Sequence, residues 1–524
     1  MEYLNLRLST PDGLDEGHIS ILARSLRGET SAQVSRLPFY QDATQWRTTL
    51  IKALGAMIYC PEDFPHIEER QWLQTTGLLD TTGQYFADSM LTLVGKAVYT
   101  SLFPGDVHDL LQKTLGAVGS GESLHIQIEF SQEIAPDSRI PDYPWELACN
   151  EQGFLCRQNV TFSRYIAFMD APPNLPPVEA IRVLLVSSAG YDPDPEIRLA
   201  PLDNQEQRAV VAGFESAQAQ GRVTLSQLKL EQGSATFKAL GDYLLDHTKE
   251  LAPHVIHFDG HGFFGKRCGV CRTIHRKLSQ THCRKCQVPL PDSPQGYLVF
   301  ESGSEASSPA DYVSAAEFGQ LLRDVGLDQP QAHGIRLVVT SACQSGRALG
   351  SESVFNGVAQ GLIQHGIPAV VAMQHSVTVN AAAAFAERFY RAIAGDRPLA
   401  AALKIGQGAM TEPNQWYRPI LYLRWLSNEG GQLFKVSGDS KEKQAIEAQI
   451  APQLETIQEK GALSRTSNRR QDFYKKQITQ LEEELAAVES DLGSALSEAN
   501  RVRLKRQAEH LLEEIERISE KLRD

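Results

Sequence analysis

The sequence lacks any run of 18 apolar residues, and its first ten residues lack the basic-then-apolar order of a secretion signal. A helix that crosses a bilayer needs about 20 apolar residues, so we expect no membrane segment. Cysteine is also scarce, with 8 residues among 524, and four of these lie in two CxxC pairs. This usage does not suit a disulfide framework and favours a reducing compartment, for which the cytoplasm is the default expectation.

Positive charge is outnumbered: 51 Lys and Arg stand against 64 Asp and Glu, which gives a formal net charge of −13. That balance argues against a general affinity for nucleic acid or anionic membranes. The hydrophobic share of 42% and the charged share of 22% are typical of a soluble globular protein. A chain of this length exceeds one ordinary core, so about two to four domains are expected.

Two short segments carry reactive side chains at the ends of apolar, β-branched runs: HFDGHG at 257–262 and VVTSACQSG at 338–346. Each is predicted as a strand followed by a loop, and loops past the carboxyl ends of parallel strands converge on one edge. A thiolate nucleophile needs a base that the fold brings beside it, and 82 residues separate His261 from Cys343. Together the segments favour a Cys/His peptidase over the alternative, a buried cysteine and a turn histidine.

The two segments resemble the signatures of the CHAT family, caspase-like cysteine peptidases of the caspase/separase clan. Further segments similar to that family are 143–147 (YPWEL), 153–155 (GFL), 181–188, 366–374, 385–392 and 416–420. The resemblance covers about residues 85–430 and implies a caspase-like α/β fold, a mostly parallel sheet sandwiched by helices. It also implies that Cys343 is the nucleophile, that His261 is the base, and that the backbone N–H groups of Gly262 and Cys343 form the oxyanion hole.

Three polar residues near these segments are candidates for the substrate pocket. Asp259 lies two residues before His261, Ser341 lies two residues before Cys343, and His375 follows a later strand. For Asp259 the alternative is an exposed loop carboxylate, and for His375 it is a solvated loop histidine.

A preference for Arg or Lys at the cleaved bond is not supported at the family's usual acidic positions. Residues 377–380 read VTVN where relatives often carry an acidic pair, and Ser341 stands where basic-specific clan members can carry Asp. Carboxylates from elsewhere, such as Asp259, Asp311 or Glu352, remain candidates. His254 and His257 precede the loop on its strand and are expected to be buried structural residues.

Strands and helices are predicted to alternate from residue 181 onward, as a parallel sheet covered on both faces requires. The predicted strands are 182–187, 225–230, 254–258, 297–300, 335–340, 368–373 and 420–425. The predicted helices are 203–219, 234–248, 314–324, 353–365, 380–394 and 398–410.

Four regions are expected along the chain. Residues 1–85 have no readable role, 86–177 form an N-terminal lobe of the CHAT region that ends in a proline-rich connector, and 178–436 form the catalytic lobe. Residues 437–524 are expected to form a helical, coiled-coil-like arm, because apolar residues there step by three and four along two stretches joined by a short polar turn. The arm either packs on itself or on the catalytic lobe, or it binds an activating protein partner or a second copy of the chain.

An insert at 263–292 contains Cys268-x2-Cys271 and Cys283-x2-Cys286. Four thiolates in two CxxC pairs are typical of a closed structural zinc site and favour Zn²⁺ over two redox pairs. The stretch between His261 and Pro291 has no acidic residue but several lysines and arginines. It could bind an acidic protein segment, nucleic acid or the acidic residues 482–484, and the alternative is a rigid, solvated knuckle.

The sequence therefore predicts a cytoplasmic, regulated cysteine endopeptidase that acts on protein substrates and has a structural zinc. Family analogy suggests a bacterial antiviral-defence or programmed-death pathway. The competing hypothesis is a catalytically silent, peptidase-like adaptor that binds partners through the arm and the zinc knuckle. A third is an enzyme that responds to nucleic acid through the basic insert, which salt-dependent binding would reveal.

Overall fold

A computed structural model describes most of the chain up to residue 435. The described residues are 2–11, 13–14, 17–39, 45–56, 58–131, 134, 140–166, 175, 177–194, 197, 199, 204–228, 235–247, 252–277, 279–292, 294–303, 310–327, 334–341 and 354–435. Residues 1–437 form one compact unit. Cys343 and the arm predicted at 437–524 lie outside the described residues.

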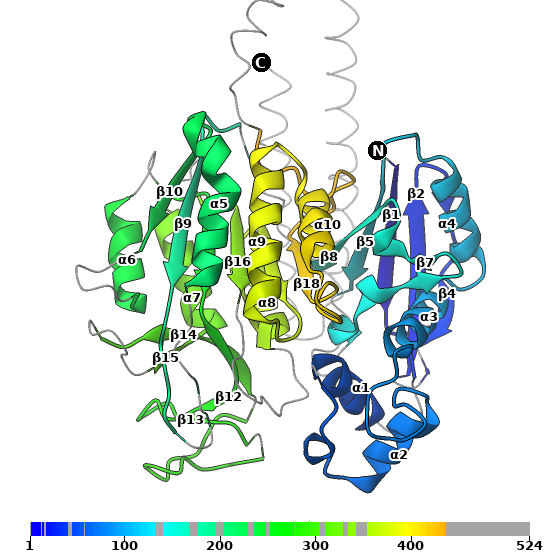
Figure 1. Cartoon of the computed structure of the whole chain (residues 1–524), viewed down its shortest axis with the longest axis horizontal. Coiled ribbons are helices and arrows are strands. Elements are labelled where there is room, and N and C mark those ends of the chain that lie inside the picture. Colours follow the sequence, from blue (N-terminus) through cyan, green and yellow to red (C-terminus); the bar gives the residue numbers. More distant parts are fainter. Residues whose placement is uncertain are drawn as a thin grey trace, which may run out of the picture. The chain divides into compact units, whose positions relative to one another are not determined.

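One twelve-stranded sheet runs through this unit, in the order β10-β9-β11-β16-β17-β18-β8-β5-β1-β2-β3, with β4 beside β2 (Figure 1). Its strands are β1 Glu2–Ser9, β2 His18–Ser25, β3 Gly28–Glu29, β4 Gln33–Arg36, β5 Leu124–Phe130, β8 Val160–Ile166, β9 Ile181–Ser187, β10 Val223–Gln227, β11 Val255–Asp259, β16 Leu337–Ser341, β17 Ala369–Met373 and β18 Pro419–Leu423. Most neighbours pair in parallel, from β10 to β17 and from β18 through β8 and β5 to β1. The fold class predicted from the sequence is confirmed.

Helices cover both faces of the sheet. They are α1 Gln45–Gly55, α2 Ile67–Thr75, α3 Met90–Leu102, α4 Asp106–Gly116, α5 Gln205–Ala219, α6 Phe237–Asp246, α7 Ala315–Leu327, α8 Val354–Gln364, α9 Val379–Ala394 and α10 Leu399–Ala409. Along β11, His257 faces α5 and α9, whereas Phe258 packs against Phe300, which in turn meets Phe318 of α7. Because successive strand residues point to opposite faces, α5 and α9 cover one face and α7 covers the other.

The predicted strands and helices beyond residue 181 match the observed ones to within a few residues. Strands such as β17 (AVVAM) are buried along their whole length, as expected for parallel strands covered on both faces. Helix α9 begins after Thr378, whose hydroxyl accepts from the backbone N–H of Ala381 at 3.2 Å and so satisfies one of the free donors of the first turn.

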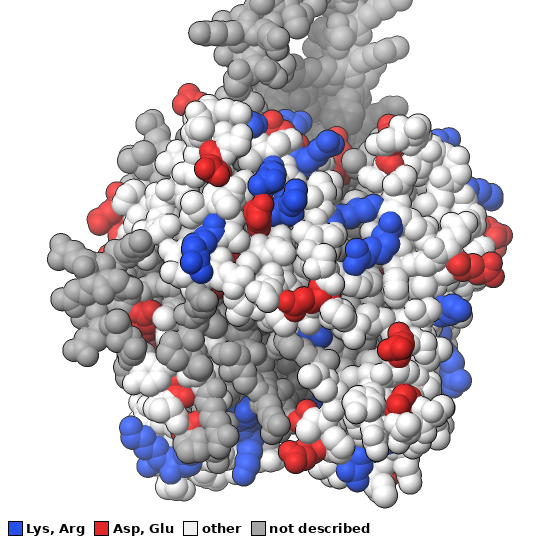
Figure 2. Space-filling model, viewed as in Figure 1, with Lys and Arg blue, Asp and Glu red and all other residues white. Residues whose placement is uncertain are grey.

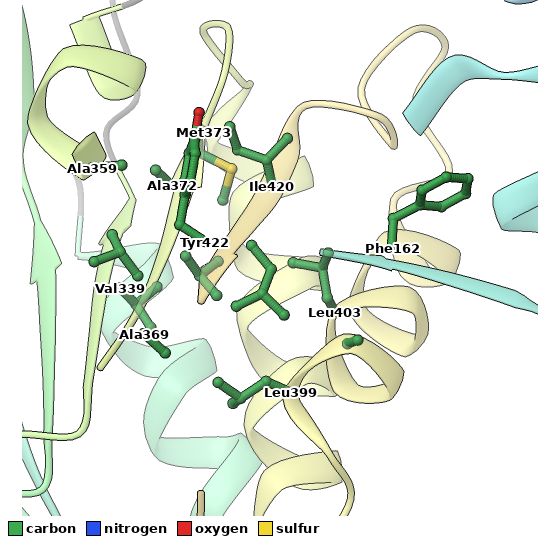
Figure 3. Packing of buried hydrophobic residues seen from close by; sticks show 14 of the residues in the cluster. Phe162, Val339, Ala359, Ala369, Ala372, Met373, Leu399, Leu403, Ile420 and Tyr422 are labelled. Atoms are coloured by element: carbon green, nitrogen blue, oxygen red, sulfur yellow. The ribbon is translucent and has the colours of Figure 1, made fainter. Parts of the chain in front are cut away.

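The hydrophobic core lies between the middle strands and the helices (Figure 3). Figure 3 shows Met373 and Ile420 close together on neighbouring strands, with Leu403 and then Leu399 of α10 further down the sheet. Each fully buried side chain of this size contributes about 1.5–3 kcal/mol relative to exposure. This core fixes the strands whose carboxyl ends carry the candidate site.

The N-terminal residues extend the same sheet. Strand β1 pairs in parallel with β5, and its buried residues Leu4, Leu6 and Leu8 alternate with more exposed ones. The sheet thus contains strands from both sides of residues 86 and 178, where the sequence predicts domain boundaries. Those boundaries stay predictions.

A smaller, four-stranded sheet stands beyond the carboxyl ends of β11 and β9, in the order β13-β12-β14-β15 (Figure 1). Its strands are β12 His261–Arg267, β13 Ile274–His275, β14 Gln295–Glu301 and β15 Ala310–Ser314; a two-stranded pair, β6 Cys149–Asn150 and β7 Gly153–Phe154, lies near α3. Short 3-10 helices span Pro61–Asp63, Ile140–Asp142, Trp145–Leu147 and Leu155–Arg157. Of the helices in the described part of the chain, none is long and apolar enough to cross a bilayer.

Candidate active site and cysteine cluster

The carboxyl ends of β11 and β16 form the edge at which both signature segments begin. The two strands pair in parallel, and their last paired residues are Asp259 and Ser341. The backbone N–H of Gly260 then donates to the carbonyl of Ser341 at 3.3 Å. Pairing therefore continues one residue past β11, and the histidine segment stays attached to the strand that leads to Cys343.

His261 begins a strand rather than lying in a loop, which corrects the prediction from the sequence. It pairs with Val299 of β14 and is buried. Only Gly260 separates β11 from β12, and a Cβ atom there would lie 2.5 Å from the ring of Phe258. The bare glycine backbone lets the chain pass from the large sheet to the small one within a single residue. Three glycines in residues 260–265 hid this strand from sequence analysis.

Gly262 follows His261 on β12 and pairs with Leu298, so the candidate oxyanion donor is part of a paired strand. The described residues thus include the predicted base, one predicted oxyanion donor and the strand that leads to the predicted nucleophile. The roles of His261, Gly262 and Cys343 all stay predictions.

Of the three candidate pocket residues, Asp259 and Ser341 lie side by side in the register and are buried, so Asp259 is not an exposed loop carboxylate. His375 follows β17 and lies elsewhere along the same edge. Only 7% of it is exposed, so the solvated-loop alternative for His375 is wrong.

The surroundings of His375 come from two distant parts of the chain. Its Nδ1 would lie 3.3 Å from a Cβ at Gly55 of α1, and its ring meets Tyr417 edge-on at 6.0 Å. Burial, followed by the positive charges of Arg418 and Arg164, holds the pKa of His375 well below its usual value. The imidazole is therefore neutral at physiological pH and can accept or donate a hydrogen bond, but it cannot serve as a cation.

The YPWEL segment anchors the end of β17 through a buried ion pair that sequence analysis did not predict. Arg164 of β8 is fully buried and donates to the Glu146 carboxylate at 2.8 and 2.5 Å. The same guanidinium donates to Gln374 Oε1 at 3.3 Å, and Gln374 Nε2 donates to the Asp142 carbonyl at 2.6 Å. Because Gln374 directly precedes His375, this pair fixes the chain that leads into the candidate pocket.

The two histidines expected to be structural are buried. His254 contacts Arg182 at 2.6 Å between Nε2 and the guanidinium. His257 contacts the Tyr390 hydroxyl at 2.7 Å through Nδ1, and its Nε2 lies 3.3 Å from Glu206 Oε1.

The four cysteines of the insert converge. The Sγ atoms of Cys268, Cys271, Cys283 and Cys286 all lie within 4.8 Å of one another. The closest pairs, Cys268 with Cys286 and Cys271 with Cys283, are 3.4 Å apart. A tetrahedral zinc–thiolate site has Zn–S bonds of about 2.3 Å and hence S–S distances of about 3.8 Å. The observed set fits such an ion.

The two CxxC turns have the same backbone design. Arg272 N–H donates to the Cys268 carbonyl at 3.0 Å, and Gln287 N–H donates to the Cys283 carbonyl at 2.9 Å. Both Arg272 and Gln287 have positive φ, 57° and 59°. Each turn therefore presents two sulfurs to the same point, as expected for ligands of one ion.

Hydrogen bonding also favours a thiolate at Cys271 of this cluster. The Thr273 hydroxyl lies 3.2 Å from Cys271 Sγ, and this hydroxyl, followed by the Thr273 backbone N–H, lowers the pKa of Cys271 to about 6. A deprotonated sulfur is the form that binds metal.

Part of the positive charge of the insert is neutralised by neighbouring acids. Arg267 pairs with Glu317 at 2.8 Å, Arg272 pairs with Asp311 at 3.0 Å, and Arg284 pairs with Asp194. Figure 2 shows blue side chains with red ones beside them in this part of the surface. Asp311, a candidate pocket carboxylate, is thus engaged with the knuckle instead.

Two family models match parts of the chain. A family model for the CHAT domain matches residues 133–425, more than half of the 524 residues, and a model for effector-associated domain 9 matches 464–524. No curated protein matches the chain.

The solved structures similar to this chain include two cysteine-proteinase-related chains at low identity. The Arg-specific cysteine proteinase gingipain R (RGPB) is 10% identical over 66% of this chain and 71% of its own, with a TM-score of 0.35. A chain of the Saccharomyces cerevisiae separase–securin complex is 9% identical over 80% of this chain and 30% of its own, with a TM-score of 0.37. Similarities of this size carry no information on activity.

Proposed function

The chain belongs to the CHAT domain family, and from that premise we propose that it is a regulated, caspase-like cysteine endopeptidase acting on protein substrates. Its nucleophile is Cys343 and its base is His261. The observation that carries the proposal is the hydrogen bond from Gly260 N–H to the Ser341 carbonyl. His261 follows that bond by one residue, and Ser341 is the last described residue before Cys343, so we expect the two side chains at one edge of the sheet.

In the proposed reaction, His261 takes the thiol proton and Cys343 Sγ attacks the carbonyl carbon of the scissile bond. The N–H groups of Gly262 and Cys343 stabilise the oxyanion, and one such donor is typically worth about 3 kcal/mol. His261 then protonates the leaving amine as the C–N bond breaks, which leaves a thioester. Water, deprotonated by His261, hydrolyses the thioester and restores the thiol.

We assign Zn²⁺ to Cys268, Cys271, Cys283 and Cys286 as a structural ion. Four thiolates would complete its coordination and leave no position for substrate or water. The ion would crosslink the two turns of the insert. Since β12 runs from His261 to Arg267, the residue just before Cys268, the cluster would hold the far end of the strand that carries the base.

The C-terminal arm is assigned to regulation. The match of effector-associated domain 9 to residues 464–524 supports binding of a protein partner or of a second copy through the arm. By family analogy the setting is bacterial defence or programmed-death signalling. Binding of nucleic acid at the insert is not favoured, because three of its arginines pair with acidic residues of the same chain.

The test is covalent labelling of the full-length protein with a panel of peptide acyloxymethyl ketones, followed by mass spectrometry. We expect one label, on Cys343, and its loss in both Cys343→Ala and His261→Ala. The matched control is Cys60→Ala, which removes a partly exposed free thiol far along the chain from both segments.

Labelling of Cys343 that persists in His261→Ala would contradict the dyad. No labelling by any reagent of the panel would instead favour the silent, peptidase-like adaptor.

A further inference from the structure

Three large apolar side chains are exposed in the segment of residues 58–88, which lies outside the matches of both family models. Ile58 is 76% exposed, Tyr85 is 64% exposed and Ile67, the first residue of α2, is 56% exposed. A single exposed apolar residue needs no explanation, but a group of them marks an interaction site.

The three side chains gather around one aromatic cluster. Its rings contact one another at centroid distances of 5.5, 5.6 and 6.4 Å, and they belong to Tyr59, Phe64 and Phe86. Ile58 directly precedes the first of these residues, Tyr85 directly precedes the last, and Ile67 follows the second by three residues. Segments that are separated by a whole helix in the sequence therefore contribute to one apolar surface.

The helices beside this surface are fixed to the rest of the compact unit. Trp46 of α1 stacks on Trp72 of α2 at a centroid distance of 5.4 Å, and Figure 1 shows the two helices side by side. At the end of α1, the Leu54 carbonyl accepts hydrogen bonds from the Tyr417 hydroxyl at 2.8 Å and from the Arg418 guanidinium at 3.4 Å. A surface that is already ordered loses little conformational entropy when a partner binds to it.

The charge of the segment is almost entirely negative. Between residues 58 and 88, Arg70 is the one basic residue, against six acidic residues: Glu62, Asp63, Glu68, Glu69, Asp80 and Asp88. Within the described part of the chain, Asp63, Glu68 and Asp88 form no ion pair. These carboxylates would attract a partner with basic side chains and repel an acidic one.

We infer that this docking surface, the exposed Ile58, Ile67 and Tyr85 with the acidic side chains around them, binds a basic, amphipathic segment of a partner protein. The apolar side of the segment would lie against the three exposed residues, and its Lys or Arg side chains would face the carboxylates. A short amphipathic helix, with apolar anchors three and four residues apart, suits a surface of this kind. The inference concerns binding alone and does not depend on the proposed peptidase function.

Charge argues against a second copy of the chain as the occupant. In a symmetric dimer the same patch of both subunits meets, so two acidic surfaces would face each other. Like charges brought together in this way oppose association. The docking surface therefore suits a different protein, and it gives a role to a region in which the sequence shows no motif.

The test measures the binding of fluorescein-labelled peptides to the full-length protein by fluorescence anisotropy. The probe is a peptide of Leu and Lys in which Leu recurs every three or four residues and so forms one face of a helix. One comparison peptide has the same composition with Leu dispersed around the helix, and the other has Glu in place of Lys. We expect the probe to bind at least about tenfold more tightly than either, because both the apolar anchors and the matched charge are needed.

Two variants place the binding site. Ile58→Ser should weaken binding of the probe about tenfold, the usual loss at a central apolar contact, whereas Leu245→Ser, at an exposed apolar position of α6, should not change it. Glu68→Gln should lower the salt dependence of binding, whereas Glu215→Gln, at an exposed position of α5, should leave it unchanged. All four positions are exposed, so the melting temperatures should match that of the wild-type protein.

Equal binding of the three peptides, or no binding of the probe, would overturn the inference. Binding that is unchanged in Ile58→Ser, or weakened as much in Leu245→Ser, would also overturn it. A dimer that forms with rising protein concentration and is lost in Ile58→Ser, as measured by light scattering, would assign the surface to self-association instead. None of these results depends on cleavage of a peptide bond, so each leaves the peptidase proposal as it stands.

Discussion

The sheet edge and the cysteine knuckle lie at the two ends of β12, yet they are held together by different means. The edge rests on the large core of the twelve-stranded sheet, where β11, β16 and β17 are buried throughout. The knuckle has its own small cluster of buried residues, Cys268, Cys283 and Leu290.

This difference indicates how each site positions its functional side chains. At the edge, residues far apart in sequence meet because strands pair in a fixed register, and burial of many side chains sets that register. In the knuckle, two short turns present the ligands, and binding of the ion would contribute folding free energy that so small a core does not supply. Changes at the edge should therefore act on chemistry or on the whole fold, and changes in the knuckle should act locally.

The largest expected effect is a loss of catalysis at the sheet edge without a loss of the fold. We expect Cys343→Ala to abolish peptide hydrolysis, and His261→Ala to lower kcat/KM by about 10²–10⁴-fold, the usual contribution of general acid–base catalysis. Kinetics and circular dichroism measured on the same preparations check this. Full activity in either variant would remove the edge as the active site.

The next effect concerns the fold that supports the edge. Arg164→Ala should lower the free energy of unfolding by about 3–5 kcal/mol, because it leaves Glu146 buried without its partner. The matched control is Arg24→Ala, which breaks the exposed pair with Glu29 and should cost about 0.2–1 kcal/mol. Urea denaturation measures both. Equal costs would mean that the buried pair does not anchor the end of β17.

The sequence predicts the knuckle and the sheet edge for different reasons and to different extents. The knuckle was predicted from spacing alone, because CxxC turns place their sulfurs locally. The strands of the edge were predicted from runs such as AVVAM, since complete burial requires an unbroken apolar segment. Strand β12 was missed because glycines interrupt HGFFGKR, and its pairing with β14 depends on residues 30 or more positions away.

Long-range burial was equally hidden. Nothing local to Glu206 or Arg164 shows that these charges lie inside the protein; α5 is a polar-looking helix in sequence, and only the fold turns Glu206 toward His257. The burial of His375 is not visible in the sequence either, because it follows a strand in a polar stretch, and Gly55 and Tyr417, from distant segments, cover it.

A smaller effect is expected from the knuckle. Purified protein should contain one zinc per chain. Cys268→Ser should lower activity several-fold while it changes the unfolding midpoint only slightly, because Cys268 directly follows the strand that carries His261. Metal analysis, peptide hydrolysis and thermal melting measure the three quantities. Cys60→Ser, outside the cluster, is the matched control.

A melting temperature of Cys268→Ser far below that of Arg164→Ala would contradict the expectation that changes in the knuckle act only locally. Four free thiols and no zinc in freshly purified protein would refute the metal assignment itself.

The smallest effect on the fold should come from removing the arm. A chain that ends at Gly438 keeps the whole compact unit of residues 1–437, so its unfolding midpoint should stay within error of the full-length protein. Its oligomeric state or its response to a partner should change, because apolar stripes at heptad spacing need a partner surface. Light scattering and hydrolysis rates, measured with both chains at equal concentration, test this. If stability, assembly and activity are all unchanged, regulation by the arm loses its support, while the edge and the knuckle keep theirs, since neither assignment uses a residue beyond 435.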